Sequence, residues 1–254
     1  MGNRPQTSNH FDDPPRLGKP YRYLWMLMLV YVAVLLMANW YDARIIGLYP
    51  VSTDAGTLIF PLSFLCSDII TEVYGYKQAR AAIWMAFALN LIFLIYGIVI
   101  THLPSPDFAM ETNRAFDRII QMNLWIILAS VVSYFCGEPL NALLVAKLKI
   151  RFAGRYMAFR FFFSTFIAAF IDSLVFSVIA FSHLFPFKAV MSLALTMWLI
   201  KVIVELCGLP LSVALAKRLK VKEQSDIYDI GTNFSLFQFE AGYAQNRDRY
   251  CAKR

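Results

Sequence analysis

Six apolar stretches, each long enough to cross a lipid bilayer, dominate this chain and restrict what it can fold into. A membrane-spanning helix needs about 20 mostly apolar residues, and in hydrocarbon the backbone has to satisfy its own hydrogen bonds, as a helix does. Of the 254 residues, 59% are hydrophobic and only 16% are charged, and the mean hydropathy is +0.54. The sequence therefore predicts an all-α integral membrane protein with six transmembrane helices, at residues 23–41, 57–74, 81–101, 118–147, 159–184 and 189–218.

The predicted spans divide the chain into three parts. Residues 1–20 are polar, charged and rich in proline, so we expect a disordered cytoplasmic leader. Residues 21–220 form the six-helix domain, and residues 221–254 form a cytoplasmic tail. The loop at 42–56 is short and semi-apolar, and we expect it to re-enter the membrane or to lie on its surface. Inside the spans, Pro139 predicts a kink in the fourth helix, and Pro210 predicts a break in the sixth.

Lysine and arginine are distributed unevenly between the two sides that six crossings create. Fifteen of them lie in the leader, the 2–3 loop, the 4–5 loop and the start of the tail, and four lie in the opposite loops or at their edges. Basic residues accumulate on the cytoplasmic side of membrane proteins, so both termini should be cytoplasmic. The net charge of +7 is then explained by topology and anionic lipid headgroups, with no nucleic-acid partner.

Asp68 and Glu72 are acidic residues at the cytoplasmic end of the second predicted helix. They are four residues apart and share one helix face. A carboxylate costs roughly 2.5–3.5 kcal/mol at the centre of a membrane helix, so the pair needs a functional reason. We interpret it as a gating or ion-coupling element. The alternative for Glu72 is a position at the membrane edge, paired with Arg80 or a lipid headgroup.

Four more ionisable residues lie within the predicted helices. Lys201 and Glu205 are one turn apart and can pair along their own helix. Asp172 has no lysine or arginine within a turn, and such an isolated acid marks a substrate or ion path more often than a packing contact. Tyr134, Glu138 and Asn141 share a face of the fourth helix; they form either a binding surface or interhelical hydrogen bonds. Together with Phe176, on the face of Asp172, these are the candidate substrate-binding residues: Tyr134, Glu138, Asn141, Asp172, Phe176, Lys201 and Glu205.

Several motifs of other protein classes are absent from the sequence. It contains no GxxxxGK[ST] motif for ATP, no HExxH motif and no Cys/His cluster with metal spacing. Its four cysteines do not form a disulfide framework. We therefore expect no cofactor, no metal and no enzymatic activity. The less favoured alternative is a membrane enzyme that uses Asp172 and Glu138 as an acid pair.

Residues 67–80, SDIITEVYGYKQAR, resemble the signature of the bacterial vitamin uptake transporters, the family of queuosine precursor transporters. The resemblance continues through ASVVSYFCGEPLNALLVAKLK at 129–149, FFFSTFIAAFIDSLVFSVIAF at 161–181 and KVIVELCGLPLSVALAKRLK at 201–220. It covers most of the membrane region and leaves out the leader.

The resemblance implies a multi-pass protein of the bacterial inner membrane that imports 7-deazaguanines such as preQ0, preQ1 or queuine without an ATPase. It also implies a fold similar to the substrate-binding subunits of energy-coupling-factor transporters, and such a subunit is the alternative function. Those subunits usually carry an AxxxA-like patch on the first helix, where this chain has Ala33 followed by Met37. This departure favours a stand-alone transporter. Proton or ion coupling and homo-oligomerisation stay open.

Overall fold

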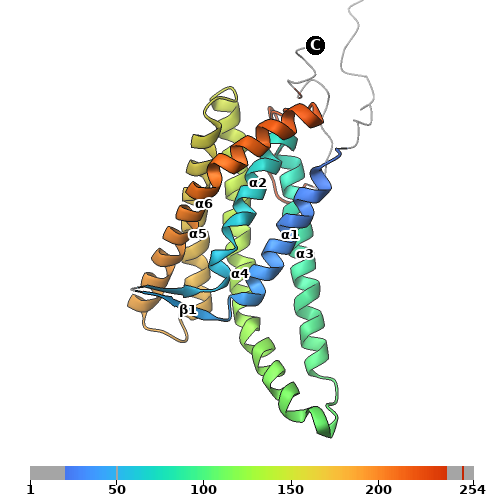
Figure 1. Ribbon diagram of the computed structural model, residues 1–254, viewed down its shortest axis with the longest axis vertical. Coiled ribbons are helices and arrows are strands. Elements are labelled where there is room, and N and C mark those ends of the chain that lie inside the picture. Colours follow the sequence, from blue (N-terminus) through green and yellow to red (C-terminus); the bar gives the residue numbers. More distant parts are fainter. Residues whose placement is uncertain (1–20, 50, 239–247, 249–254) are drawn as a thin grey trace, which may run out of the picture.

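The computed structural model describes residues 21–49, 51–238 and 248, and in this part of the chain it contains six helices long and apolar enough to cross a membrane. The predicted disorder of the leader concerns residues outside this range. The protein is mostly helical, and the bundle is elongated (Figure 1). The helices are α1 (Leu24–Tyr41), α2 (Pro61–Tyr74), α3 (Tyr76–Thr101), α4 (Met110–Arg151), α5 (Met157–Phe181) and α6 (Phe187–Glu223), with short 3-10 turns η1 (Gly56–Leu58) and η2 (Asp107–Ala109).

The six predicted spans are confirmed, but α3, α4 and α6 are longer than expected. α4 has 42 residues, about 63 Å at 1.5 Å per residue, and α3 and α4 extend beyond the other helices at the lower end of the view (Figure 1). The break predicted at Pro210 is wrong, because α6 continues through it. α4 likewise continues through Pro139. Neighbouring helices in a membrane protein can satisfy the backbone groups that a proline frees.

The loop between α1 and α2 is a β-hairpin, which the all-α prediction did not include. β1 (Ile45–Leu48) pairs antiparallel with β2 (Val51–Asp54), and Ile45 lies opposite Asp54. The hairpin reaches from the end of α1 toward α5 and α6 (Figure 1), and β2 packs against α6. It therefore covers one end of the helix bundle.

α2 is the central helix of the bundle. Of its 14 residues, all but Leu62 are buried, and it packs against α1, α3, α4 and α6. Pro61 begins it with a φ suited to the first turn. It ends at Gly75, whose φ of 85° favours glycine. The polar residues of α2 therefore face protein on every side, away from lipid.

The two ends of the described domain lie at the same end of the bundle, as six crossings require (Figure 1). The carboxylate of Glu223, the last residue of α6, accepts hydrogen bonds from the backbone N–H groups of Arg22 and Tyr23 at 3.0 and 2.6 Å. The Tyr74 hydroxyl donates to the same carboxylate at 3.0 Å. These contacts fix the start of α1, the end of α2 and the end of α6 together.

Gly137 allows α4 and α5 to approach closely beside Asp172. A Cβ atom at this position would lie 2.8 Å from the Asp172 Cβ and 3.4 Å from the Ala168 carbonyl oxygen. We expect Gly137→Val to lower the free energy of unfolding by about 1–3 kcal/mol, because overpacking forces the helices apart. Thermal unfolding in detergent measures this. Gly47→Val is the matched control, since nothing lies within 4 Å of its added Cβ; equal destabilisation by both changes would contradict the prediction.

Candidate functional site

Three carboxylates from three helices meet in the centre of the bundle. Asp68 of α2, Glu138 of α4 and Glu205 of α6 are each fully buried, and α2 packs directly against both α4 and α6. We call these three residues the acid cluster. Asn141 Nδ2 donates to Asp68 Oδ1 at 2.6 Å, and Ser63 Oγ donates to Glu138 Oε1 at 2.9 Å. Each of these two acids therefore has one oxygen held by a neighbouring helix.

The remaining oxygens of the acid cluster have no hydrogen-bond partner among the residues that the structure describes. They are Asp68 Oδ2, Glu138 Oε2 and both carboxyl oxygens of Glu205. A buried acceptor without a donor costs about 1–3 kcal/mol, and more when it is charged. Four such atoms lie on α2, α4 and α6, where N–H or O–H donors from another molecule could satisfy them.

The ammonium group of Lys201 pairs with Asp172 at the α5–α6 interface. Lys201 Nζ lies 2.5 Å from Asp172 Oδ2 and 4.2 Å from the centre of the Phe60 ring. The predicted pairing of Lys201 with Glu205 along α6 is therefore wrong. The prediction that Asp172 is isolated is also wrong. Its partner, Lys201, lies 29 residues further along the chain, on another helix. The periodicity of a helix shows which residues one turn apart can pair, but it cannot show a partner on another helix.

The hairpin places two more carboxylates beside this ion pair. Asp42 and Asp54 are buried, and they line a small cavity together with Asp172, Lys201 and Phe176. Thr57 donates its backbone N–H and its hydroxyl to Asp54, both at 2.7 Å. Burial, and then the charge of Asp54, raise the pKa of the Asp42 carboxyl well above its usual range. Neither residue was among the predicted site residues, because the loop 42–56 was expected to re-enter the membrane or to lie on its surface, and a hairpin folded against α6 was not expected.

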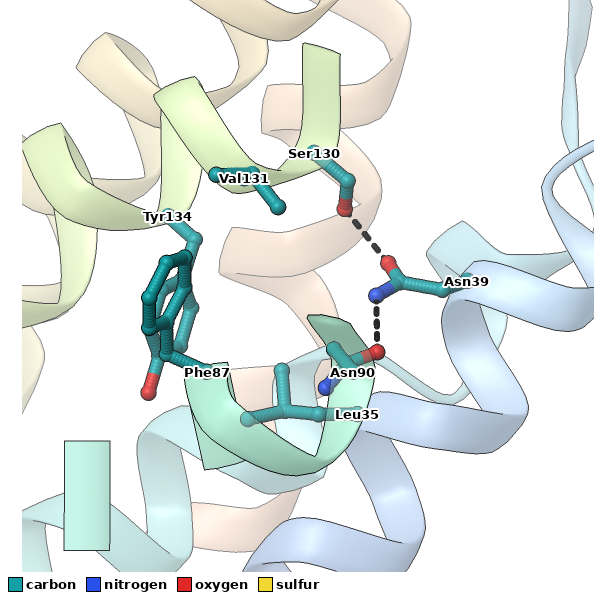
Figure 2. A pocket seen from close by; sticks show the side chains of 7 residues that line it. All are labelled: Leu35, Asn39, Phe87, Asn90, Ser130, Val131 and Tyr134. Atoms are coloured by element: carbon teal, nitrogen blue, oxygen red, sulfur yellow. Dashed lines mark hydrogen bonds between the residues drawn. The ribbon is translucent and has the colours of Figure 1, made fainter. Parts of the chain in front are cut away.

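Tyr134 occupies a second small cavity, with an amide pair opposite (Figure 2). Its hydroxyl donates to the Ile83 carbonyl at 2.9 Å, so the Tyr31 hydroxyl, 2.9 Å away, is the donor in their mutual hydrogen bond. Asn39 Nδ2 donates to Asn90 Oδ1 at 2.6 Å, and Ser130 Oγ donates to Asn39 Oδ1 (Figure 2). The Tyr134 hydroxyl is therefore fully engaged, and its ring lines the cavity and contacts Phe135 edge-on.

Phe176 and Asn141, two further predicted residues, are also buried. Phe176 packs edge-on against Phe181, with 5.9 Å between ring centres. Asn141 accepts a hydrogen bond from Thr165 Oγ1 at 3.4 Å while it donates to Asp68. The structure thus brings Asn141, Glu138 and Glu205 to the acid cluster, and Asp172, Phe176 and Lys201 to the cavity beneath the hairpin.

Glu72 belongs to a separate group of charges near the end of α2. Arg160 Nη1 and Nη2 donate to its two carboxyl oxygens at 2.6 and 3.0 Å, and Lys220 Nζ donates to Oε1 at 2.6 Å. Lys149 Nζ lies 3.9 Å from Oε1. Asp226, which follows α6, lies 2.8 Å from Lys149 Nζ and 2.6 Å from Lys220 Nζ. We call these five residues the charge network.

The charge network corrects the interpretation of Glu72 as a residue at the membrane edge. Glu72 is fully buried and pairs with Arg160 of α5, whereas Arg80 donates to the carbonyls of Asn233 and Ser235. Arg160 was predicted to belong to the basic 4–5 loop, but it lies in the first turn of α5 and is fully buried. Asp68 and Glu72, predicted as one pair, thus lie in two different clusters.

The structure shows the candidate site in a closed conformation. The cavities at Tyr134 and beneath the hairpin have volumes of about 20 and 10 Å³, close to the space for one water molecule each. Neither cavity has room for a molecule much larger than water in this conformation. Among the described residues, no group of three His, Cys, Asp or Glu side chains is placed to hold a metal ion.

Comparisons with known proteins agree on one family. The family model described as "Putative vitamin uptake transporter" matches residues 54–215. A "Probable queuosine precursor transporter" of Bacillus subtilis (strain 168) is 24% identical over 191 residues, which cover 74% of this chain and 82% of that protein. The "Queuosine precursor transporter" of Escherichia coli (strain K12) is 26% identical over 132 residues, covering 51% and 57%.

A further "Probable queuosine precursor transporter", of Haemophilus influenzae, is 23% identical over 97 residues, covering 37% of this chain and 38% of that protein. No solved structure matches the chain. The family match spans the acid cluster and well over half of the chain. With its six membrane-length helices, the protein is therefore a multi-pass inner-membrane protein of bacteria that belongs to the vitamin uptake transporter family.

Proposed function

We propose that this protein is a secondary transporter that imports queuosine precursors, the 7-deazaguanines preQ0, preQ1 or queuine, across the bacterial inner membrane. The observation that carries the proposal is the set of buried acceptor oxygens without donors on Asp68, Glu138 and Glu205. The relatives named as queuosine precursor transporters support the choice of substrate.

The chemistry of a deazaguanine fits this acceptor set. Its guanine-like edge carries ring and amino N–H donors side by side, and one carboxylate can accept from two adjacent donors. Glu205, with both oxygens free of donors among the described residues, is the best placed for such a bidentate contact. Stacking on an aromatic ring contributes roughly 1–3 kcal/mol per base, and Tyr134 and Phe176 are our candidates for it.

The distribution of basic residues supports an orientation with both termini in the cytoplasm. In this orientation the charge network lies on the cytoplasmic side of the acid cluster, and the hairpin lies on the outer side. Asp42, Asp54 and the Asp172–Lys201 pair then form the outer end of the path. We propose that Asp68 couples transport to a proton or another cation, because no lysine or arginine of the described residues donates to it.

Uptake by a precursor-deficient strain tests the function. Bacterial cells that cannot synthesise preQ0 and lack their own transporter should regain queuosine in their tRNA when they express this chain and receive preQ0 or preQ1. The same cells without the expressed chain are the control for passive entry. If well-inserted protein restores no queuosine with any of the three precursors, the proposal is wrong.

The second candidate is a substrate-binding subunit that needs an ATP-driven module, as the resemblance to energy-coupling-factor subunits implies. Purified protein in liposomes without any ATPase distinguishes the two. Uptake of labelled preQ1 into such liposomes supports the secondary transporter, and uptake that requires an added ATPase module supports the subunit.

Size-exclusion chromatography with light scattering measures whether the protein forms a homo-oligomer.

A further inference from the structure

We infer that residues 225–236, which follow α6, form a strap that closes the cytoplasmic exit of the transport path by holding the charge network together. The inference rests on the proposed transport function and orientation and adds the element that controls release from the site.

The charge network lies next to the acid cluster because α2, α4 and α6, which supply the three acids, also supply Glu72, Lys149 and Lys220. α5 supplies Arg160 to the charge network and Thr165, which donates to the Asn141 that holds Asp68. α2 supplies Asp68 and Glu72, which are one turn apart, so about 6 Å of helix separates the two clusters there. Each of the other three helices also supplies one residue at or next to the acid cluster and one residue of the charge network. They are Asn141 and Lys149 on α4, Thr165 and Arg160 on α5, and Glu205 and Lys220 on α6.

The strap contributes the second anion that the charge network needs. Without Asp226, three cations would share the single carboxylate of Glu72 in a buried place. Asp226 contacts both Lys149 and Lys220 and thereby offsets their mutual repulsion. Lys149, only 1% exposed, also donates to the Glu72 carbonyl of α2 at 2.6 Å and to the Ile227 carbonyl of the strap at 2.5 Å. One lysine thus joins α4, α2 and the strap.

Further contacts fasten the strap across the junction of α2 and α3. The Tyr76 N–H donates to Asp229 at 3.0 Å, and the Tyr76 hydroxyl donates to the Phe234 carbonyl at 2.9 Å. Trp84 Nε1 donates to the Leu236 carbonyl at 2.8 Å. Ile227, Tyr228 and Asp229 are nearly fully buried. These are mostly hydrogen bonds to the strap backbone, which can break and re-form without changing the helices.

Access to the space between the two clusters measures whether the strap closes the exit. The reporter is Thr165→Cys in a background whose four native cysteines are replaced by alanine, in inside-out vesicles treated with a membrane-impermeant maleimide. We expect Asp226→Asn to raise the rate of labelling by about tenfold or more, because removing one partner of a partly buried ion-pair network shifts the equilibrium at least that far. Asp107→Asn, an exposed acid near the other end of the bundle, should leave the rate unchanged.

A second reporter separates opening of the exit from general unfolding. Ala129 is fully buried in the apolar core near Phe176. Labelling of the Ala129→Cys reporter should therefore stay slow when Asp226→Asn is added. Unchanged labelling at Thr165→Cys in the Asp226→Asn variant would overturn the inference, and so would equal increases at both reporters.

Tethering the strap gives the converse test. The rings of Tyr76 and Phe234 contact each other, with 5.0 Å between their centres, so cysteines at both positions can be joined by a reducible bis-maleimide. We expect uptake of preQ1 to fall at least tenfold in the tethered protein and to recover on reduction. Full uptake with the tether in place would overturn the inference. Absence of uptake in the untethered protein would instead count against the transport function, while the labelling result still decides the strap.

Discussion

Replacing Lys201 by Met is expected to lower the free energy of unfolding by about 3–5 kcal/mol, because it leaves the Asp172 carboxylate buried without its partner. Asp172 and Lys201 are only 2% and 4% exposed, so water cannot substitute for the lost ammonium group. The double variant Lys201→Met with Asp172→Leu should recover most of this loss, since an apolar pair of similar volume needs no charge compensation. Thermal and denaturant unfolding in detergent measure the changes.

Double-mutant cycles decide which acid is the partner of Lys201. We expect a coupling energy of about 2 kcal/mol or more between Lys201 and Asp172, and less than about 0.5 kcal/mol between Lys201 and Glu205. Lys188→Met, at an exposed position of α6, is the matched control and should change stability little. A larger coupling to Glu205 would restore the pairing along α6 and contradict the structure.

Replacing Glu205 or Glu138 by Gln is expected to reduce uptake of preQ1 by about 10- to 100-fold, because hydrogen bonds to a charged group contribute about 1.5–3 kcal/mol each. The substitution keeps the size of the side chain but removes the charge and turns one acceptor into a donor. Stability should stay the same or rise, since these carboxylates have oxygens without donors in the described structure. Opposite effects on stability and on transport are the signature of a ligand site.

The measurement is initial uptake of labelled preQ1 at equal amounts of inserted protein, with the melting temperature measured on the same variants. Glu111→Gln is the control, because Glu111 is exposed in the first turn of α4. Uptake at the wild-type rate in both Glu205→Gln and Glu138→Gln would place the substrate site elsewhere. Loss of uptake together with loss of folded protein would mean that these acids serve the structure instead.

Much of the fold follows from local properties of the chain. The length and apolarity of the six stretches predict the six helices, because a bilayer demands a helix of about that length. The same reasoning could not predict the hairpin between α1 and α2, whose strands have only four residues each. The break predicted at Pro210 was also wrong, because the effect of a proline in a membrane helix depends on which groups of neighbouring helices donate hydrogen bonds to the freed backbone.

The sequence by itself identified Asp68, Glu138, Asp172, Lys201 and Glu205 as polar residues inside the membrane domain, and the motif around Asp68 and Glu72 indicated the family. It did not reveal that Asp42, Asp54 and Arg160 are buried as well. Only the tertiary structure decided how these residues pair: Lys201 with Asp172, Glu72 with Arg160, and Asn141 with Asp68. The reason is physical. Membrane helices are apolar on most of their surface, so periodicity does not show which face turns inward. Partners on other helices are set by packing and rotation of the whole bundle.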